Sequence, residues 1–304
     1  MDRSNISIDR MQTFVRLAER GSFSAVAREV GVGQSTVTRQ IKELEEAVGV
    51  PLLTRTTRRV ALTDEGQGFY AACLNVLRLV EQATDEARND RSAAAGNIRI
   101  SCTSALGVLH VSRLLFAFQD QYSSIGIDLS LTDERINLVK EGIDIAIRLG
   151  PLSDSSMKLH ALGMSKRLLV AAPSYLATVA RPLNIQDISG YQAIRMTNVA
   201  GSETLELTGQ NGDRSRVDLT GSFRVDNGLA AREALAAGRG IAPAHQWLVD
   251  DLLKTGELEI LFPEYGLQPV PVSMLIVPER RGISRVRLLA DYLAEQIPNL
   301  PGID

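Results

Sequence analysis

Residues 21–63 read GSFSAVAREVGVGQSTVTRQIKELEEAVGVPLLTRTTRRVALT, and this stretch decides the fold of the N-terminal part of the chain. It holds two short helical patterns joined by a Gly-Val-Gly turn, followed by β-prone stretches at Leu52 to Thr54 and Val60 to Thr63. Glycine suits a turn between helices because its backbone reaches left-handed conformations. The order of helix, turn, helix and hairpin predicts a winged helix-turn-helix domain.

The second helical pattern, from about Gln34 to Glu46, has two chemically different faces. One face carries apolar residues at spacings of four, three and four, as expected of a helix packed on a core. These residues are Val37, Ile41, Leu44 and Val48. The other face and the hairpin carry amide, hydroxyl and basic side chains, which are the groups that contact base edges and phosphates. The residues predicted to bind DNA are Gln34, Ser35, Thr36, Thr38, Arg39, Lys42, Arg55, Arg58 and Arg59.

The charge of this region does not by itself predict nucleic-acid binding, and a polar helix face is usually only solvated. Residues 1–66 hold 10 Lys and Arg and 9 Asp and Glu, a net charge of +1, and residues 31–60 hold five basic and three acidic residues. A nearly neutral domain must concentrate its positive field on a local surface. The prediction of duplex DNA as a partner therefore depends on the turn and the basic hairpin beside the helix.

Length and composition predict a cytoplasmic protein with one small and one larger domain. The chain has 304 residues and a formal net charge of −3, and no run of apolar residues approaches the ~18 of a membrane span. The first ten residues, MDRSNISIDR, lack the apolar core of a signal peptide. Cys73 and Cys102 are expected to be reduced and buried rather than to form a redox switch.

A long helix is predicted from Asp64 to about Arg91, since this segment lacks proline and Thr63 can cap its start. Apolar residues recur along it at alternating spacings of four and three, which is the repeat of a coiled-coil seam. The alternative is packing within one domain, but a helix of ~40 Å is long for a small core. The residues predicted to form a dimer contact are Phe69, Cys73, Val76, Val80 and Ala83.

After the small and polar residues 90–96, the pattern changes to alternating strands and helices. The strand-like segments are Ile98 to Thr103, Ile127 to Thr132 and Ile143 to Leu149, and the helical segments are Leu106 to Tyr122 and Ile136 to Glu141. This alternation predicts a parallel sheet with right-handed crossovers.

A second lobe is predicted farther along the chain. Two strands, Arg167 to Ala172 and Pro271 to Val277, are expected to carry the chain between the lobes. The region between them has its own helical and strand-like segments, and a further helix is predicted near the C-terminus. The helices are Asn227 to Gly238, Pro243 to Lys254 and Ser284 to Ile297, and the β-prone pieces are Ala193 to Met196 and Val217 to Val225. The pattern therefore predicts two α/β lobes with a cleft between them.

A ligand in such a fold is expected at the carboxyl ends of the strands, where helix N-termini present free N–H groups. Hydroxyls, amides and one guanidinium fall at these places and favour a small anionic ligand. The candidates are Thr103, Ser104, Thr132, Arg148, Asn198 and Asn227. Serine, threonine and asparagine at helix starts are equally expected as ordinary caps. For Arg148 an ion pair with Asp144 or Glu134 is the alternative.

Catalysis and metal binding receive little support from the sequence. His110, His160 and His245 lie far apart, and neither a Gly-x-Ser-x-Gly elbow, a His-Glu-x-x-His motif nor a zinc-like Cys and His spacing occurs. We therefore expect no enzyme activity, no metal and no cofactor. Two alternatives stay open: an enzyme or solute-binding protein with the same two lobes, and an architectural DNA binder that takes no ligand.

The run from Phe14 to Gly66 resembles the N-terminal domain of the LysR-type bacterial transcriptional regulators. In that family the recognition segment commonly reads Ser-Gln-Pro-Ala-Val-Ser-Arg-Gln-Ile, and residues 33–41 here read Gly-Gln-Ser-Thr-Val-Thr-Arg-Gln-Ile. The departures are Gly33, Ser35, Thr36 and Thr38, so the operator preference is not expected to carry over. The later pattern, with segments such as Gly142 to Arg148 and Ala237 to Ala242, resembles the family's effector domain.

The resemblance covers nearly the whole chain and implies a one-component transcriptional regulator. It implies a multidomain protein with a winged helix-turn-helix domain at 1–63, a dimerisation linker helix and hinge at 64–95, and a two-lobed, periplasmic-binding-protein-like α/β domain at 96–304. Lobe I would comprise 96–168 and 272–304, and lobe II 169–271. The implied partners are double-stranded operator DNA, a small-molecule effector and further copies of the chain, as a dimer and a homotetramer. RNA polymerase is a further implied partner, and a membrane is not.

Overall fold

The computed structural model describes residues 6–55, 60–88, 95–134, 136–139, 141–151 and 158–304. Their contacts divide the chain into two compact units. One unit comprises Met1–Ser92 and Ile136–Gly142, and the other comprises Ala93–Arg135 and Ile143–Asp304. No helix in the described part of the chain is both long and apolar enough to cross a membrane.

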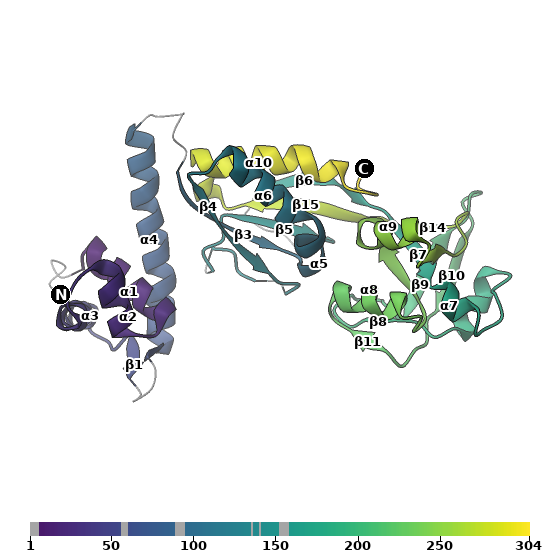
Figure 1. The fold of residues 1–304 in the computed structure, drawn as a ribbon, viewed down its shortest axis with the longest axis horizontal. Helices are drawn as coiled ribbons and strands as arrows, with labels where there is room; N and C mark the ends of the chain where they lie inside the picture. Colours follow the sequence, from purple (N-terminus) through teal and green to yellow (C-terminus); the bar gives the residue numbers. More distant parts are fainter. Residues whose placement is uncertain (1–5, 56–59, 89–94, 135, 140, 152–157) are drawn as a thin grey trace. The chain divides into compact units, whose positions relative to one another are not determined.

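The N-terminal unit is a winged helix-turn-helix, as the sequence predicts (Figure 1). Its elements are α1 (Ile8–Arg20), α2 (Phe23–Val30), α3 (Gln34–Val48), β1 (Leu53–Arg55), β2 (Val60–Leu62) and α4 (Asp64–Arg88). The hydroxyl of Ser22 caps α2 by accepting from the amide of Ala25. Gly31 ends α2 with a φ of 73°, a left-handed conformation that glycine adopts without strain.

Helix α1 is the element of this unit that the sequence analysis did not predict. It supplies Phe14 and Leu17, which are fully buried against Val37, Ile41 and Leu44 of α3. Burial of these large side chains is the main stabilising contribution to a domain this small. The same apolar face of α3 that the four-three-four spacing predicts is therefore the face that packs on α1.

Helix α4 packs its first turns on this core. A Cβ built at Gly66 would lie only 2.0 Å from the carbonyl oxygen of Leu52, so a residue without a side chain is needed where α4 passes the wing. The rings of Phe69 and Phe14 lie 5.6 Å apart between centroids. Cys73 is 1% exposed within the same core. The prediction that Cys73 forms a dimer contact is therefore wrong, because a core residue cannot reach a second chain.

The second unit begins with a five-stranded sheet in the order β4-β3-β5-β15-β6. These strands are β3 (Gly96–Cys102), β4 (Ile125–Leu131), β5 (Ile145–Leu149), β6 (Lys158–Ser165) and β15 (Val270–Ile276). The strands β4, β3 and β5 are parallel, as predicted, whereas β15 pairs antiparallel with both β5 and β6. Helices α6 (Ser112–Gln121) and α10 (Ser284–Gln296) pack on this sheet. Sheet and helices together form the first lobe.

The second lobe contains the remaining strands and helices. Strand β7 (Arg167–Ala171) lies between β12 (Ile241–His245) and β13 (Glu259–Ile260). A second sheet has the order β10-β9-β14, and β8 and β11 form a pair. The bounds of these strands are Arg195–Met196 for β8, Thr204–Thr208 for β9, Arg214–Asp218 for β10, Arg224–Val225 for β11 and Gly266–Leu267 for β14. The helices are α7 (Pro173–Leu176), α8 (Gly228–Ala236) and α9 (Gln246–Thr255).

Three expectations about individual elements are corrected, and one strand was missed. The described residues of the expected helix at 136–141, which are 136–139 and 141, lie in coil and turns rather than in a helix. Residues 243–245 extend β12, and α9 begins only at Gln246. The stretch 217–225 is split between β10 and β11. Strand β6 was not predicted at all.

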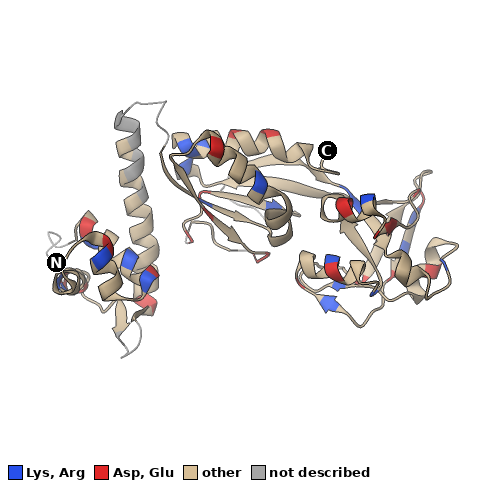
Figure 2. Cartoon of the chain, viewed as in Figure 1, with Lys and Arg blue, Asp and Glu red and all other residues tan. Residues whose placement is uncertain are grey.

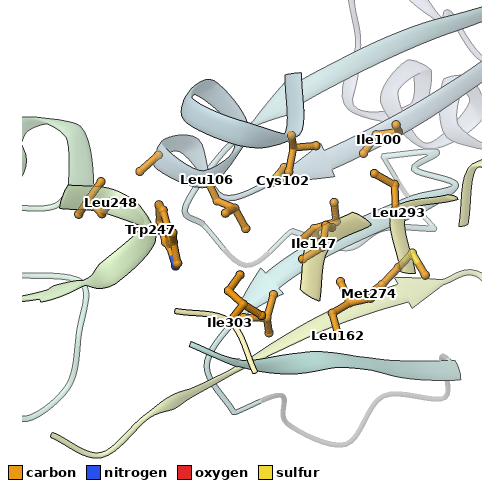
Figure 3. Packing of buried hydrophobic residues seen from close by; sticks show 14 of the residues in the cluster. Ile100, Cys102, Leu106, Ile147, Leu162, Trp247, Leu248, Met274, Leu293 and Ile303 are labelled. Carbon is orange, nitrogen blue, oxygen red and sulfur yellow. The ribbon is translucent and has the colours of Figure 1, made fainter. Parts of the chain in front are cut away.

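One hydrophobic core runs through both lobes of this unit. Figure 3 shows Ile100, Ile147, Met274 and Leu293 packed in the first lobe, with Trp247 of the second lobe beside Leu106. Leu106 belongs to α5 (Ser104–Leu106), which a π-helical turn at Gly107–Val111 connects to α6. The start of this helical segment is therefore held against the second lobe by buried apolar contacts.

Candidate nucleic-acid interface and effector site

The polar face of α3 is exposed, and the opposite face is buried. The side chains of Arg39 and Lys42 are 71% and 73% exposed, and Gln34 and Ser35 are exposed at the first turn. Val37 and Ile41 are fully buried on the opposite side. Lys and Arg positions are interspersed with Asp and Glu positions along the described helices of this unit (Figure 2). Among the described residues, the exposed face of α3 therefore carries the predicted DNA contacts.

The basic side chains of α3 are paired along the helix by weak ion pairs. The Arg39 Nε lies 3.9 Å from an oxygen of Glu43, and the Lys42 Nζ lies 3.5 Å from an oxygen of Glu46. Such exposed pairs contribute ~0.3 to 0.5 kcal/mol, so a phosphate or base edge can replace them at little cost. Glu43 also pairs with Arg10 of α1, which keeps its charge compensated when Arg39 turns outward.

The remaining polar residues of α3 divide between structural and exposed roles. The hydroxyl of Thr38 donates to the carbonyl of Gln34 at 3.0 Å. Thr38 can therefore contact a base only through its methyl group or as a hydrogen-bond acceptor. Gln40 faces inward, where its side-chain oxygen accepts from Thr13. Thr36 is half-buried at the first turn. These contacts fix the rotation of α3 about its own axis.

Glu45 connects α3 to the wing. One of its carboxylate oxygens accepts hydrogen bonds from the backbone amides of Leu52 and Leu53, at 2.8 and 3.1 Å. The strand β1 pairs with β2 in register, with Leu53 opposite Leu62. Of the predicted wing contacts, Arg58 and Arg59 lie outside the described residues, and for Arg55 only the backbone, in β1, is described.

We expect Glu45→Ala to lower the free energy of unfolding by about 1 to 3 kcal/mol, because two partly buried amide donors lose a charged acceptor. Urea denaturation of the full-length protein measures this change. Glu46→Ala is the matched control, since Glu46 is exposed and pairs only with Lys42 among the described interactions. Equal losses for the two variants would contradict the assigned role of Glu45.

An exposed apolar stripe follows α4 beyond the core. Val76 and Val80 are each 37% exposed, Leu79 is 52% exposed, and Ala83 is exposed as well. These positions are spaced i, i+3, i+4 and i+7, so they share one side of the helix. Leu79 was missed in the sequence analysis, although its position three residues after Val76 was the available signal.

Four of the six effector-site candidates gather at the carboxyl ends of β3, β4 and β5. The backbone amide of Ser104, at the start of α5, donates to Asp133 Oδ1 at 3.0 Å. The Thr132 amide donates to the carbonyl of Cys102, and its hydroxyl accepts from Glu134. The buried hydroxyl of Thr103 has no hydrogen-bond partner among the described residues. Asp133 was missed, although it directly follows the predicted strand end.

Arg148 is buried in β5 and anchored by neutral groups. Its guanidinium donates to the hydroxyl of Ser101 at 2.7 Å and to the carbonyl of Ile147 at 3.0 Å. Burial lowers the pKa of Arg148, and Asp133 opposes this shift. The expected alternative of an Asp144 partner is wrong, because Asp144 instead lies 3.3 Å from the Nε of Arg280.

The two candidates of the second lobe lie next to each other. Asn198 donates from its amide nitrogen to the carbonyl of Asp226 at 2.6 Å. The neighbouring Asn227 caps α8 by accepting from the amides of Leu229 and Ala230, which is the ordinary structural role weighed above. A Cβ built at Gly228 would lie 3.1 Å from the Cβ of Ala105. The starts of α8 and α5 therefore meet, which brings Asn227 near Ser104.

A buried polar cluster joins the two lobes beside this site. The indole N–H of Trp247 donates to the hydroxyl of Ser165, which lies 2.8 Å from the Nδ1 of His245. The ring of His245 stacks on Trp247. His110 of the first lobe lies 2.8 Å from the Trp247 carbonyl through its Nε2. Burial, with the nearby Arg167 charge, lowers the pKa of His245 to about 4.

A neutral His245 gives stability a defined pH dependence. An unfolded histidine takes up a proton as the pH falls through about 6.5, whereas His245 stays neutral in the folded state until about pH 4. The unfolded state binds more protons in this window, so the free energy of unfolding should fall by about 3 kcal/mol between these values. Denaturant titrations between pH 7 and pH 4 measure this loss, and His245→Gln should remove most of it. Parallel curves for the two proteins would contradict the assignment.

Two family models match the two parts of this architecture. The model described as "Bacterial regulatory helix-turn-helix protein, lysR family" matches residues 8–67, and the model "LysR substrate binding domain" matches residues 91–298. The transcriptional activator AaeR of Escherichia coli K12 is 29% identical over 293 residues, covering 95% of this chain and 94% of its own. The regulator CrgA of Neisseria meningitidis serogroup C is also 29% identical over 293 residues, covering 96% and 97%.

Solved structures that match nearly the whole chain show the same architecture. The structure of CrgA, a LysR-type transcriptional regulator from Neisseria meningitidis, superposes with a TM-score of 0.62 at 27% identity, covering 95% of this chain and 98% of that one. The virulence activator AphB of Vibrio cholerae gives a TM-score of 0.62 at 26% identity, covering 95% and 99%.

Proposed function

The chain belongs to the LysR family of transcriptional regulators, and we propose that it reads its operator with the exposed face of α3. The observation that carries this proposal is the division of α3 into a fully buried apolar face and an exposed face. The exposed face presents the amide, hydroxyl and basic side chains of Gln34, Ser35, Thr38, Arg39 and Lys42. A helix of this kind enters the major groove when no part of its own protein covers it.

We propose that the regulator acts as a dimer through the exposed stripe of α4. The coiled-coil spacing of Val76, Val80 and Ala83 supports this contact, and Leu79 adds to it. Two recognition helices related by a two-fold axis would then meet two half-sites. Higher assembly and contact with RNA polymerase, in the cytoplasm, are the further proposals that follow from the family.

Selection of bound duplexes from a random DNA library tests operator reading by the full-length protein. The expected result is enrichment of one two-fold symmetric sequence with half-sites about one or more helical turns apart. Recovery of unrelated sequences with equal affinity would instead favour an architectural DNA binder.

We propose that a small anionic effector binds where β3, β4 and β5 end and α5 meets α8. The buried Arg148 supplies a positive charge, and the buried hydroxyl of Thr103 has no partner of its own among the described residues. Ligand binding alters DNA occupancy only if the two arrangements of the protein differ in DNA affinity. Thermal-shift measurements with small carboxylates on the full-length protein test this site, and Thr103→Val should reduce the stabilisation.

A further inference from the structure

A hollow lies in the first lobe, between α10 and the strands β15 and β6. Its volume is about 200 Å³. The floor consists of apolar side chains that are themselves buried: Met274, Ile276, Val286 and Ala290. An apolar cavity of ~150 Å³ is enough to hold a single benzene ring, so this hollow has room for a one-ring molecule.

The rim of the hollow is polar and carries a net positive charge. Among the described residues, Arg281, Arg287 and His160 line it together with one carboxylate, that of Asp291. Neither Arg281 nor Arg287 makes an ion pair with another residue in the described part of the chain. Guanidinium groups bind carboxylates through charge-assisted hydrogen bonds. The combination of an apolar floor and a cationic rim fits a small molecule with an apolar ring and one carboxylate.

This hollow is separate from the proposed effector site. Ile147 of β5 lies opposite Met274 of β15, and Arg148 lies opposite Ser273. Successive residues of a strand point to opposite faces of the sheet. Met274, which lines the hollow, therefore points to one face of the sheet and Arg148 to the other, so one small ligand cannot touch both.

Helix α10, which lines the hollow, also contacts the start of β3, where the chain enters this unit. Arg285, which precedes the hollow residue Val286, donates from its Nε to the carbonyl of Asn97 at 3.1 Å. A Cβ at Gly96 would lie 3.2 Å from the Arg285 guanidinium carbon. A ligand that restrains the motion of the N-terminal end of α10 would therefore also restrain Gly96 and Asn97, at the start of β3.

We propose that the hollow between α10 and β6 is a second ligand site for a small aromatic monocarboxylate. This inference goes beyond operator reading and the effector site proposed above, and it does not depend on either. The Arg281 and Arg287 guanidiniums bind the carboxylate, while the ring lies on Met274, Val286 and Ala290.

Fluorine NMR of 4-fluorobenzoate, titrated with the full-length protein, tests the proposal. We expect saturable binding that weakens about tenfold in the double variant Arg281→Gln and Arg287→Gln, through loss of a charge-assisted hydrogen bond. Ala294→Phe should abolish binding by filling the mouth of the hollow, since Ala294 is an exposed lining residue on α10. All these positions are on the surface, and circular dichroism verifies that each variant is folded.

Two controls separate this site from others. Arg113→Gln removes a comparable exposed guanidinium from α6 and should leave the affinity unchanged. Thr103→Val alters the effector site and should also leave it unchanged. The proposal is overturned if the wild-type protein shows no saturable binding, if the double variant and Ala294→Phe bind like the wild type, or if Thr103→Val alone removes binding.

Discussion

The variant Val80→Asp is expected to sediment as a monomer and to bind operator DNA about 10² to 10⁴ times more weakly than the wild type. Val80 lies on the exposed apolar stripe of α4, and a carboxylate there would have to be buried without a partner in a helix pair. A monomer also cannot bind two half-sites at once. In the dimer, binding of the first recognition helix raises the effective concentration of the second at its half-site, and the loss of this gain sets the size of the decrease in DNA affinity. Sedimentation velocity and fluorescence anisotropy measure the two changes.

Gln67→Asp is the matched control for this prediction. It introduces the same charge on an exposed position of α4 that lies outside the apolar stripe. Sedimentation and DNA affinity should both stay close to the wild type. If Val80→Asp leaves the sedimentation coefficient unchanged, the α4 stripe is not the contact between chains.

Local pattern was sufficient to predict most of the N-terminal unit. The spacing of Val37, Ile41 and Leu44 identifies the buried face of α3, and glycine at position 31 identifies the turn. The pattern also predicted a seam along α4, but it could not separate the residues that pack within the unit from those that are left exposed. Cys73 and Val76 fit the same repeat, and only the position of α1 decides that the first is buried.

In the second unit, most of the candidate effector site lies at strand ends that were predicted from the sequence. Thr103, Ser104, Thr132 and Arg148 come together because neighbouring parallel strands end at one edge of the sheet. The partners of these residues could not be predicted, since Ser101 and Asp133 meet them only through the three-dimensional register. Arg148 illustrates this point, because the carboxylate nearest to it in sequence, Asp144, faces Arg280 instead.

The variant Arg39→Ala is expected to lose about 1 to 3 kcal/mol of binding free energy for the selected operator and to discriminate less between operator and mutated sites. Arg39 lies in the middle of the exposed face of α3, where a guanidinium can reach a guanine edge or a phosphate. The folded unit should keep its stability. The Arg39 ion pair is exposed and contributes little, and Glu43 retains its contact with Arg10.

Arg28→Ala provides the matched control, because it removes an equal charge from α2, whose exposed Arg28 lies outside the recognition helix. Anisotropy titrations at several salt concentrations, with operator and mutated duplexes, separate the two kinds of contact. A base contact raises the affinity for the operator more than for the mutated duplex, so its loss narrows the difference between them. Loss of a phosphate contact weakens binding to both duplexes alike, and it lowers the slope of log affinity against log salt concentration by about one. If Arg39→Ala weakened both duplexes equally, Arg39 would be a phosphate contact, and the choice of operator would have to be made by Gln34, Ser35 or Thr38.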